Sequence, residues 1–181
     1  MVVEKHHYQT AIDIFNRCFS IDYNTRLVKG DNEPIYLPSD ANRPYHAILF
    51  AHGFFSSALH ECAHWLIAGA KRRELVDFGY WYAPDGRNQS QQQVFESVEV
   101  KPQALEWILS VAADYRFRII VDNLNGESTD PRPFKEAVHQ QVMRYINEGL
   151  SARAQTFRLA LARDYNTPEQ IDRASFDINA I

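Results

Sequence analysis

Apolar and polar positions follow two different periods along this chain, which predicts a mixture of helices and short strands. Apolar residues recur at helical spacing over residues 6–19 and 134–150 and around residues 157–165. Each of these segments is expected to be an amphipathic helix with one face on the core. A further helix is expected from Pro102 onward, because proline is tolerated in the first helical turn, and the proline within residues 167–169 predicts another helix start.

Short apolar runs between turn-forming residues predict the strands. The clearest lies at residues 45–51, where the sequence YHAILFA indicates a buried strand. Residues 75–83 and 116–121 are expected to form further strands. Residues 25–42 carry one glycine and two prolines and are expected to be a loop, with a short extended piece at residues 35–37.

Together these elements predict an α+β fold in one domain that spans residues 1–181. A chain of 181 residues with 45% hydrophobic residues is large enough to bury a core. The net charge of −4 gives no reason to expect nucleic-acid binding, and no apolar run approaches the length of a membrane span. The two cysteines, without an apolar signal sequence, indicate free thiols in the cytoplasm. The glutamine-rich residues 88–93 fit either a loop or the start of a helix.

The candidate chemistry is concentrated at residues 60–64, which read His-Glu-x-x-His. On a helix, residues four apart lie on one face, so His60 and His64 can present two imidazoles to one metal ion. Glu61 then points about a quarter-turn away, toward a water or a substrate beside the metal. Zinc peptidases use this motif with the glutamate as general base, whereas two histidines and one carboxylate also suit non-haem iron(II). The motif therefore predicts a metal more firmly than it identifies the metal.

The surrounding residues predict that the motif lies on a partly buried helix. An apolar stripe next to the two histidines consists of Leu59, Ala63, Leu66 and Ile67. Ser56 or Ser57 is expected to cap the start of this helix. Gly69 and the basic run at residues 71–73 are expected to mark its end.

A third protein ligand is needed to complete such a site. The carboxylates of the following helical region are the candidates, in the order Glu99, Glu96 and Glu106. Glu99 is expected at or just before the start of that helix, on the same face as Glu106. Asp77 and Asp85 are more distant candidates. The absence of a Cys-x-x-Cys pair argues against a zinc site built from cysteines.

Three blocks of the sequence, at residues 52–69, 72–87 and 95–107, resemble the elongation factor P hydroxylase family. They read HGFFSSALHECAHWLIAG, RRELVDFGYWYAPDGR and FESVEVKPQALEW. The resemblance extends over nearly the whole chain. It implies a small zincin-like fold, in which a short mixed sheet packs on the metal-binding helix and further helices. It also implies an oxygenase that hydroxylates a lysine of elongation factor P after a β-lysyl group has been attached.

The resemblance further implies a metal site of two histidines and one carboxylate, which carries over to His60, His64 and, at the third position, Glu99. Fe(II) would be the metal and dioxygen the co-substrate, while Zn could occupy the site in a purified sample. The partner would be the lysylated form of elongation factor P. The chain is expected to be a cytoplasmic monomer.

Two other functions are compatible with the residues alone. A small zinc metallopeptidase would use Glu61 as the catalytic base that activates a water on the metal. A metal-stabilised binding domain would lose its fold when the metal is removed and would catalyse no reaction.

Contacts to the substrate are expected near the end of the metal-binding helix and beyond it. Asp77, Glu61 or Asp85 would hold the ammonium groups of a lysyl substrate through charge-assisted hydrogen bonds. Residues 80–82, which are two tyrosines and a tryptophan, would line the slot around its aliphatic stem. The basic run at residues 71–73, with Arg87, fits either a helix end or a docking patch for the factor, which the resemblance implies to be acidic.

Overall fold

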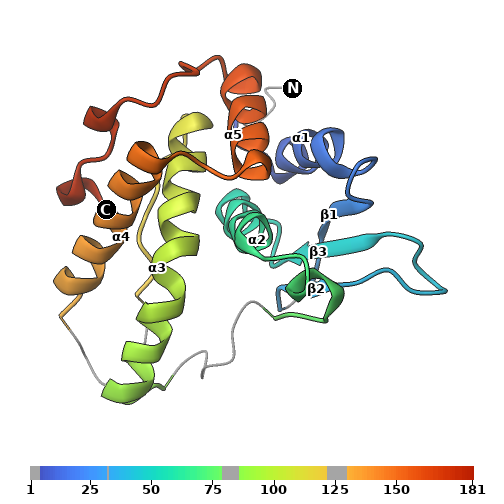
Figure 1. The fold of residues 1–181 in the computed structure, drawn as a ribbon, viewed down its shortest axis with the longest axis horizontal. Coiled ribbons are helices and arrows are strands. Elements are labelled where there is room, and N and C mark those ends of the chain that lie inside the picture. Colours follow the sequence, from blue (N-terminus) through green and yellow to red (C-terminus); the bar gives the residue numbers. More distant parts are fainter. Residues whose placement is uncertain (1–4, 32, 79–85, 122–129) are drawn as a thin grey trace.

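The computed structural model describes residues 5–31, 33–78, 86–121 and 130–181. In this part of the chain a three-stranded sheet is accompanied by five α-helices, and α2 lies between the sheet and the long helix α3 (Figure 1). The helices are α1 (Tyr8–Phe19), α2 (Phe55–Ile67), α3 (Gln89–Ala112), α4 (Arg132–Glu148) and α5 (Ala152–Tyr165). The α+β class is confirmed, whereas the zincin-like fold stays a prediction.

The sheet is mixed and its central strand is the one with the apolar run. Its strands are β1 (Thr25–Lys29), β2 (Ile35–Leu37) and β3 (His46–Phe50), in the order β1-β3-β2. β3 pairs in parallel with β1 and antiparallel with β2. Ala47, Ile48 and Phe50 of β3 are buried, as expected for a strand between two neighbours. The strands predicted at residues 45–51 and 35–37 are confirmed.

The expectation of a loop before residue 35 is wrong at β1. Only Leu27 and Val28 are apolar in this strand, and a run of two apolar residues is too short to indicate a strand. Pairing with β3 creates it, with Leu27 opposite Ile48. On the other side of β1, the side-chain oxygen of Asn16 accepts a hydrogen bond of 2.8 Å from the backbone N–H of Leu27, which closes that sheet edge at this residue.

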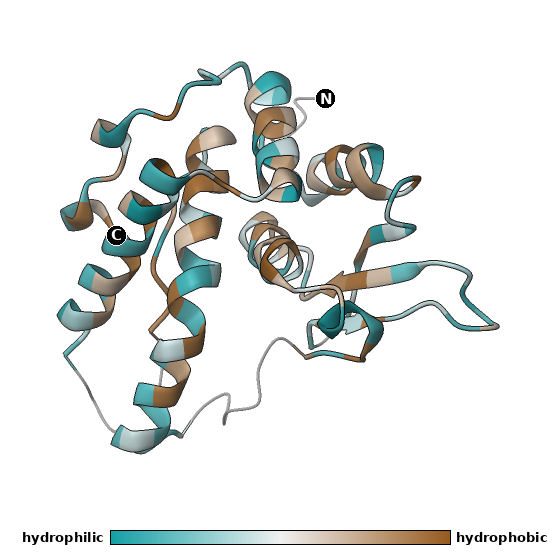
Figure 2. Cartoon of the chain, in the orientation of Figure 1, coloured by the Kyte–Doolittle hydropathy of each residue, from teal (hydrophilic) through white to brown (hydrophobic). Residues whose placement is uncertain are grey.

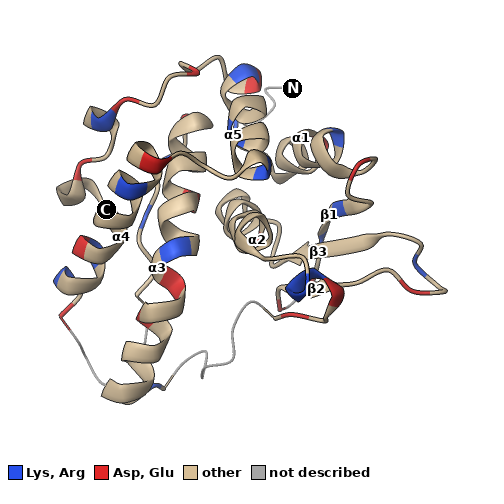
Figure 3. Ribbon diagram, viewed as in Figure 1, with Lys and Arg blue, Asp and Glu red and all other residues tan. Residues whose placement is uncertain are grey.

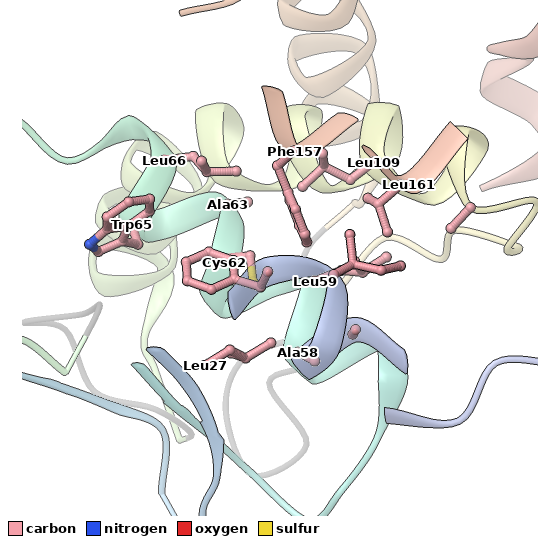
Figure 4. Close-up of a cluster of buried hydrophobic side chains, with 14 of the residues drawn as sticks. Leu27, Ala58, Leu59, Cys62, Ala63, Trp65, Leu66, Leu109, Phe157 and Leu161 are labelled. Carbon is pink, nitrogen blue, oxygen red and sulfur yellow. The ribbon is translucent and has the colours of Figure 1, made fainter. Parts of the chain in front are cut away.

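Helix α2 carries the His-Glu-x-x-His motif and packs its apolar side into the core. Figure 4 shows Leu59, Cys62, Ala63 and Leu66 of α2 together with Leu109 of α3 and with Phe157 and Leu161 of α5. The predicted serine cap is wrong, because the N-cap is Phe54 and makes no side-chain cap bond. The hydroxyl of Ser57 instead accepts a hydrogen bond of 3.1 Å from the N–H of Ala51, in the turn that follows β3.

Arginines hold the carbonyl end of α2. Arg153 of α5 donates hydrogen bonds of 2.9 and 2.7 Å to the carbonyls of Trp65 and Ala68. The basic run lies beyond this end, around the short 3₁₀ helix η1 (Arg72–Glu74), where it forms a positive cluster next to β2 (Figure 3). Arg73 of this run donates a hydrogen bond of 3.5 Å to the carbonyl of Ala68, whereas Arg72 binds Asp77. Both interpretations of the basic run stay predictions.

Helix α3 begins well before Pro102, so the helix start expected at this proline is wrong. Asn88 forms a capping box with Gln91, and the helix runs from Gln89 to Ala112 with Pro102 inside it. An interior proline removes one helical hydrogen bond. Packing of α3 on both α2 and α4 offsets that loss. Of the two expectations for residues 88–93, the helix start is confirmed.

Two further predictions are wrong because side chains replace regular backbone pairing. No strand forms at residues 116–121; instead Gln103 of α3 bonds the N–H and the carbonyl of Ile120 at 2.9 and 2.8 Å. No helix begins at residues 167–169, where the hydroxyl of Thr167 donates a bond of 2.6 Å to the last carbonyl of α3.

The strand expected at residues 75–83 appears in the described residues only as a single bridge. The backbones of Asp77 and Tyr36 exchange hydrogen bonds of 3.0 and 2.7 Å on the side of β2 away from β3. Residues 79–85 lie outside the described residues, and with them the rest of this prediction. The bridge closes the edge of β2 at Tyr36.

The amphipathic helices predicted near the two ends of the chain are confirmed as α1, α4 and α5. Figure 2 shows that hydrophobic residues concentrate on α2, on β3 and on the middle of α3, where these elements meet. Within the described ranges, no helix combines the length and apolar character needed to cross a membrane.

Candidate metal centre

Two histidines of α2 point toward α3 from successive helical turns. The Nε2 atoms of His60 and His64 are 3.1 Å apart, and their ring centroids are 4.7 Å apart. Only 17% and 15% of the two side chains are exposed. The spacing of four residues thus brings two imidazole nitrogens together, as the sequence predicts.

Helix α3 supplies a carboxylate to both imidazoles. Oε2 of Glu99 lies 3.5 Å from Nε2 of His60, and Oε1 lies 3.4 Å from Nε2 of His64. One ligand atom from each of the three residues lies within 4.8 Å of the others. Atoms that bind one metal ion at about 2.1 Å stand about 3.0–3.5 Å apart, so this donor set fits a divalent transition metal.

Glu99 reaches the histidines from the interior of α3, so its expected place at or before the helix start is wrong. Its side chain is 2% exposed, and the helical backbone on both sides fixes its position. The expectation that Glu99 and Glu106 share a face is confirmed, because both carboxylates reach His60. Seven residues make about two helical turns, which accounts for the shared direction.

Glu106 orients one imidazole instead of joining the donor set. Its Oε2 lies 2.8 Å from Nδ1 of His60, so a proton on Nδ1 is donated to this carboxylate and Nε2 is left to face Glu99 and His64. Metal-binding histidines are commonly held in this way. Burial alone would lower the pKa of His60, but the hydrogen bond to Glu106 and the charges of Glu106 and Glu99 outweigh it and raise the pKa to about 10.

The other predicted carboxylates are engaged elsewhere. Glu96 accepts a hydrogen bond of 3.1 Å from Gln92, one turn before it on α3. Asp77 is bound by two nitrogens of Arg72. Asp85 lies outside the described residues. Within the described ranges, His60, His64 and Glu99 are the cluster of histidine, cysteine and acidic side chains close enough to share a metal.

Glu61 lines a pocket beside the histidines, called here the inner pocket. Its walls include Tyr36 and Ile48 of the sheet, His64 and Trp65 of α2, and Asp77. Glu61 forms no hydrogen bond or ion pair with the described residues. Burial raises the pKa of its carboxyl, and the nearby imidazoles partly offset this. The sequence predicts Glu61 beside the metal, but gives no sign of this pocket or that Tyr36, Ile48 and Trp65 converge there.

A second hollow, called here the outer groove, lies on the other side of His64. It runs between the end of α2 and the middle of α3, and its lining includes Arg72, Ser97, Val98 and Lys101. His64, Ala68 and Arg72 line both hollows. The two hollows therefore meet at His64, and they differ in that Glu61 and Asp77 line the inner pocket while no carboxylate of the described residues lines the outer groove.

The fold and the site define a class of protein: a small α+β protein with a candidate mononuclear centre of two histidines and one carboxylate on two packed helices. A profile of the family described as elongation factor P hydroxylase matches residues 14–176. The elongation factor P lysine hydroxylase of Haemophilus influenzae is 57% identical over 177 residues, which cover 98% of this chain and 99% of that protein. The chain belongs to the elongation factor P hydroxylase family.

Proposed function

We propose that this chain is an Fe(II)-dependent hydroxylase that acts on the β-lysylated lysine of elongation factor P. The observation that carries the proposal is the convergence of His60, His64 and Glu99 within 4.8 Å, in a chain that matches this family over nearly its full length. Bound there, Fe(II) would supply the activation of dioxygen, for which two histidines and one carboxylate are a common donor set. A cytoplasmic monomer is part of the proposal.

The side chains of the protein have separate tasks in this scheme. Nε2 of His60, Nε2 of His64 and the Glu99 carboxylate would hold the metal. Glu106 keeps the proton of His60 on Nδ1, which fixes the tautomer that leaves Nε2 free to bind. Trp65 helps to exclude water from the inner pocket, because it is 4% exposed and packs in the core beside the site.

The closed edges of the sheet favour the hydroxylase over the zinc peptidase alternative. Extended peptides commonly bind proteins by adding a strand to an open sheet edge. In the described residues both outer strands are closed at a central position, β2 by the backbone of Asp77 and β1 by the side chain of Asn16. A substrate that enters as one long side chain needs no open sheet edge, which fits hydroxylation of a modified lysine.

Intact-mass analysis tests the proposed activity. The protein is loaded with Fe(II) and incubated in air with lysylated elongation factor P, and a gain of one oxygen atom on the factor is expected. The same protein loaded with Zn(II), and a His64→Ala variant supplied with Fe(II), are the controls that should leave the mass unchanged. Cleavage of the factor or of other peptides by the zinc form, without any gain of oxygen, would support the peptidase instead.

A further inference from the structure

Three carboxylates lie around the candidate metal centre. Glu61, Glu99 and Glu106 are close enough that the last two act electrostatically on the first, and all three surround His60 and His64. Glu99 faces the two imidazoles and Glu106 holds His60, whereas the charge of Glu61 meets no hydrogen bond or ion pair among the described residues. Such a charge is unfavourable away from water, so the site is suited to receive one further cation.

The described part of the chain does not supply that cation to Glu61. The positive side chains of the inner pocket are Arg72 and Arg73. Arg72 is bound to Asp77, and Arg73 donates to the carbonyl of Ala68 and lies over the ring of Trp65. Glu61 has no lysine or arginine partner in the described residues. A ligand is therefore the natural source of its counter-charge.

We propose that the inner pocket binds the ammonium end of the modified lysine, with Glu61 as its counter-ion, while the protein substrate lies over the outer groove. This inference rests on the proposed function. A β-lysyl group joined through its carboxyl leaves ammonium groups on a methylene chain and one amide. The stem of the substrate then passes His64, which lines both hollows.

The inner pocket has about 20 Å³ of free space, enough for the ammonium group, and its walls offer surface to the atoms that follow it. Tyr36, Ile48 and Trp65 offer apolar surface to methylene groups. The indole N–H of Trp65 is buried and makes no hydrogen bond of good geometry in the described residues, although the Tyr36 hydroxyl lies near it. A carbonyl oxygen of the ligand would satisfy this donor, which otherwise costs free energy.

The outer groove favours the opposite charge and so sets the direction of entry. Its charged lining residues are Arg72 and Lys101, with no carboxylate among the described residues that line it. An ammonium group placed there would meet two cations and no carboxylate of the described residues, whereas in the inner pocket Glu61 and Asp77 face Arg72 and Arg73. An acidic protein surface would be attracted to the groove. The ammonium end therefore belongs in the inner pocket and the body of the factor over the groove.

Binding without turnover tests this assignment. The protein is loaded with Fe(II) under anaerobic conditions, and its Kd is measured for three forms of elongation factor P by calorimetry. The forms are the lysylated factor, the lysylated factor acetylated on its lysyl amines, and the unmodified factor. The wild type should bind the lysylated form about tenfold or more tightly than the other two, since one charge-assisted contact is lost in each.

Substitutions at Glu61 and Lys101 test the roles of the inner pocket and the outer groove separately. Glu61→Gln should bring the Kd for the lysylated form to that for the acetylated form, and Glu61→Asp, which keeps the charge, should retain part of the preference. Lys101→Glu should weaken binding of all three forms by a similar factor. Glu148→Gln, at an exposed position on α4, is the matched control for the loss of one carboxylate. Elemental analysis of each variant confirms that the metal is retained.

The outcomes distinguish this inference from the proposed function. If the wild type prefers the lysylated factor and Glu61→Gln keeps the same preference, Glu61 is not the counter-ion and the inference is overturned, while the hydroxylase proposal stands. If the wild type shows no preference for the lysylated form, the proposed substrate fails and the assignment of the pocket fails with it. The acetylated factor tests the ammonium group independently of any variant that folds poorly.

Discussion

Glu99 and Glu106 both reach His60 but differ in the atom that they contact. Glu99 faces Nε2, the atom available to a metal, whereas Glu106 holds Nδ1. Sequence spacing predicts that both lie on one face, because seven residues return to the same side of a helix. It cannot tell which carboxylate meets which nitrogen, because that depends on how far α3 is shifted along α2. The role of Glu106 was therefore missed, although its position was a candidate.

Substitution of these carboxylates should separate the two roles. Glu99→Ala removes a ligand and should abolish stoichiometric metal binding. Glu106→Ala leaves the three donors in place and should weaken metal binding about 10–100-fold, as is typical when a partner of a metal-bound histidine is removed. Metal content by elemental analysis and Kd by competition with a chelator measure both effects. Glu96→Ala, one turn away, should keep the wild-type Kd, and a loss of metal in that variant alone would reassign the third ligand.

Metal binding should release a proton from His60. Its pKa of about 10 in the metal-free folded protein means that Nε2 is protonated at neutral pH, and a metal must displace this proton. The apparent affinity should therefore rise about tenfold per pH unit between pH 7.5 and 9 from this group. Calorimetric titration with Zn(II) in two buffers of different ionisation enthalpy counts the protons, and a count of zero would contradict the assignment.

The raised pKa of His60 should also make the metal-free protein less stable as the pH rises, whereas metal binding becomes tighter. The pKa of His60 is raised above the value of about 6.5 that it has in an unfolded chain. Its contribution to the free energy of unfolding is therefore complete below about pH 6.5 and is lost as the pH rises through about 10. The metal-free and metal-loaded forms thus depend on pH in opposite directions.

At the scale of elements, α3 shows both what the sequence predicts and where it fails. The periodic residues after Pro102 correctly indicate a helix. The helix start was misplaced because a proline at this position suits a first turn by its local chemistry alone. The capping box at Asn88 and the packing of α3 between α2 and α4 instead favour a helix that starts at Gln89. Tertiary packing therefore overrides the local signal and places Glu99 inside the helix.

The cap of α3 gives a prediction at this scale. Asn88→Ala removes the side-chain oxygen that accepts from the N–H of Gln91 and should lower the free energy of unfolding by about 1 kcal/mol. Glu99 is far along the helix from this cap, so the Kd for metal should stay within about twofold, because a lost cap loosens mainly the first turn. Asn88→Asp keeps an acceptor and should be nearly neutral. Chemical denaturation gives the first quantity and chelator competition the second.

For the whole molecule, the sequence predicts the class of fold and the pair of histidines, because both follow from local periodicity. It does not predict the closed sheet edges or the two hollows around His64, since these depend on residues far apart in the chain. Tyr36 of β2, Trp65 of α2 and Asp77, which follows η1, illustrate the point, because all three line the inner pocket. Residues 80–82, expected at the substrate slot, lie outside the described residues.

The basic run near η1 gives a prediction about association, which Lys71 tests best. Arg72 and Arg73 make internal contacts, so reversing their charge would disturb the fold as well as any docking surface. Lys71 is exposed and makes no side-chain hydrogen bond or ion pair in the described residues. Lys71→Glu should slow hydroxylation of the factor at low substrate and low ionic strength, and the difference should shrink with added salt. Arg144→Glu on α4 is the control, and equal rates for Lys71→Glu and the wild type at both salt concentrations would place docking elsewhere.

Cys62 sits between the two histidines in sequence, yet its side chain points into the core on the apolar side of α2 (Figure 4). Burial raises the pKa of this thiol well above its usual range, so very little thiolate forms. Oxidation and alkylation of cysteine both proceed through the thiolate. A protein proposed to handle dioxygen thus keeps a reducing group next to its reaction centre without exposing it to oxidants. A thiol reagent should modify the half-buried Cys18 in the native protein, and should reach Cys62 only at the rate at which the core opens.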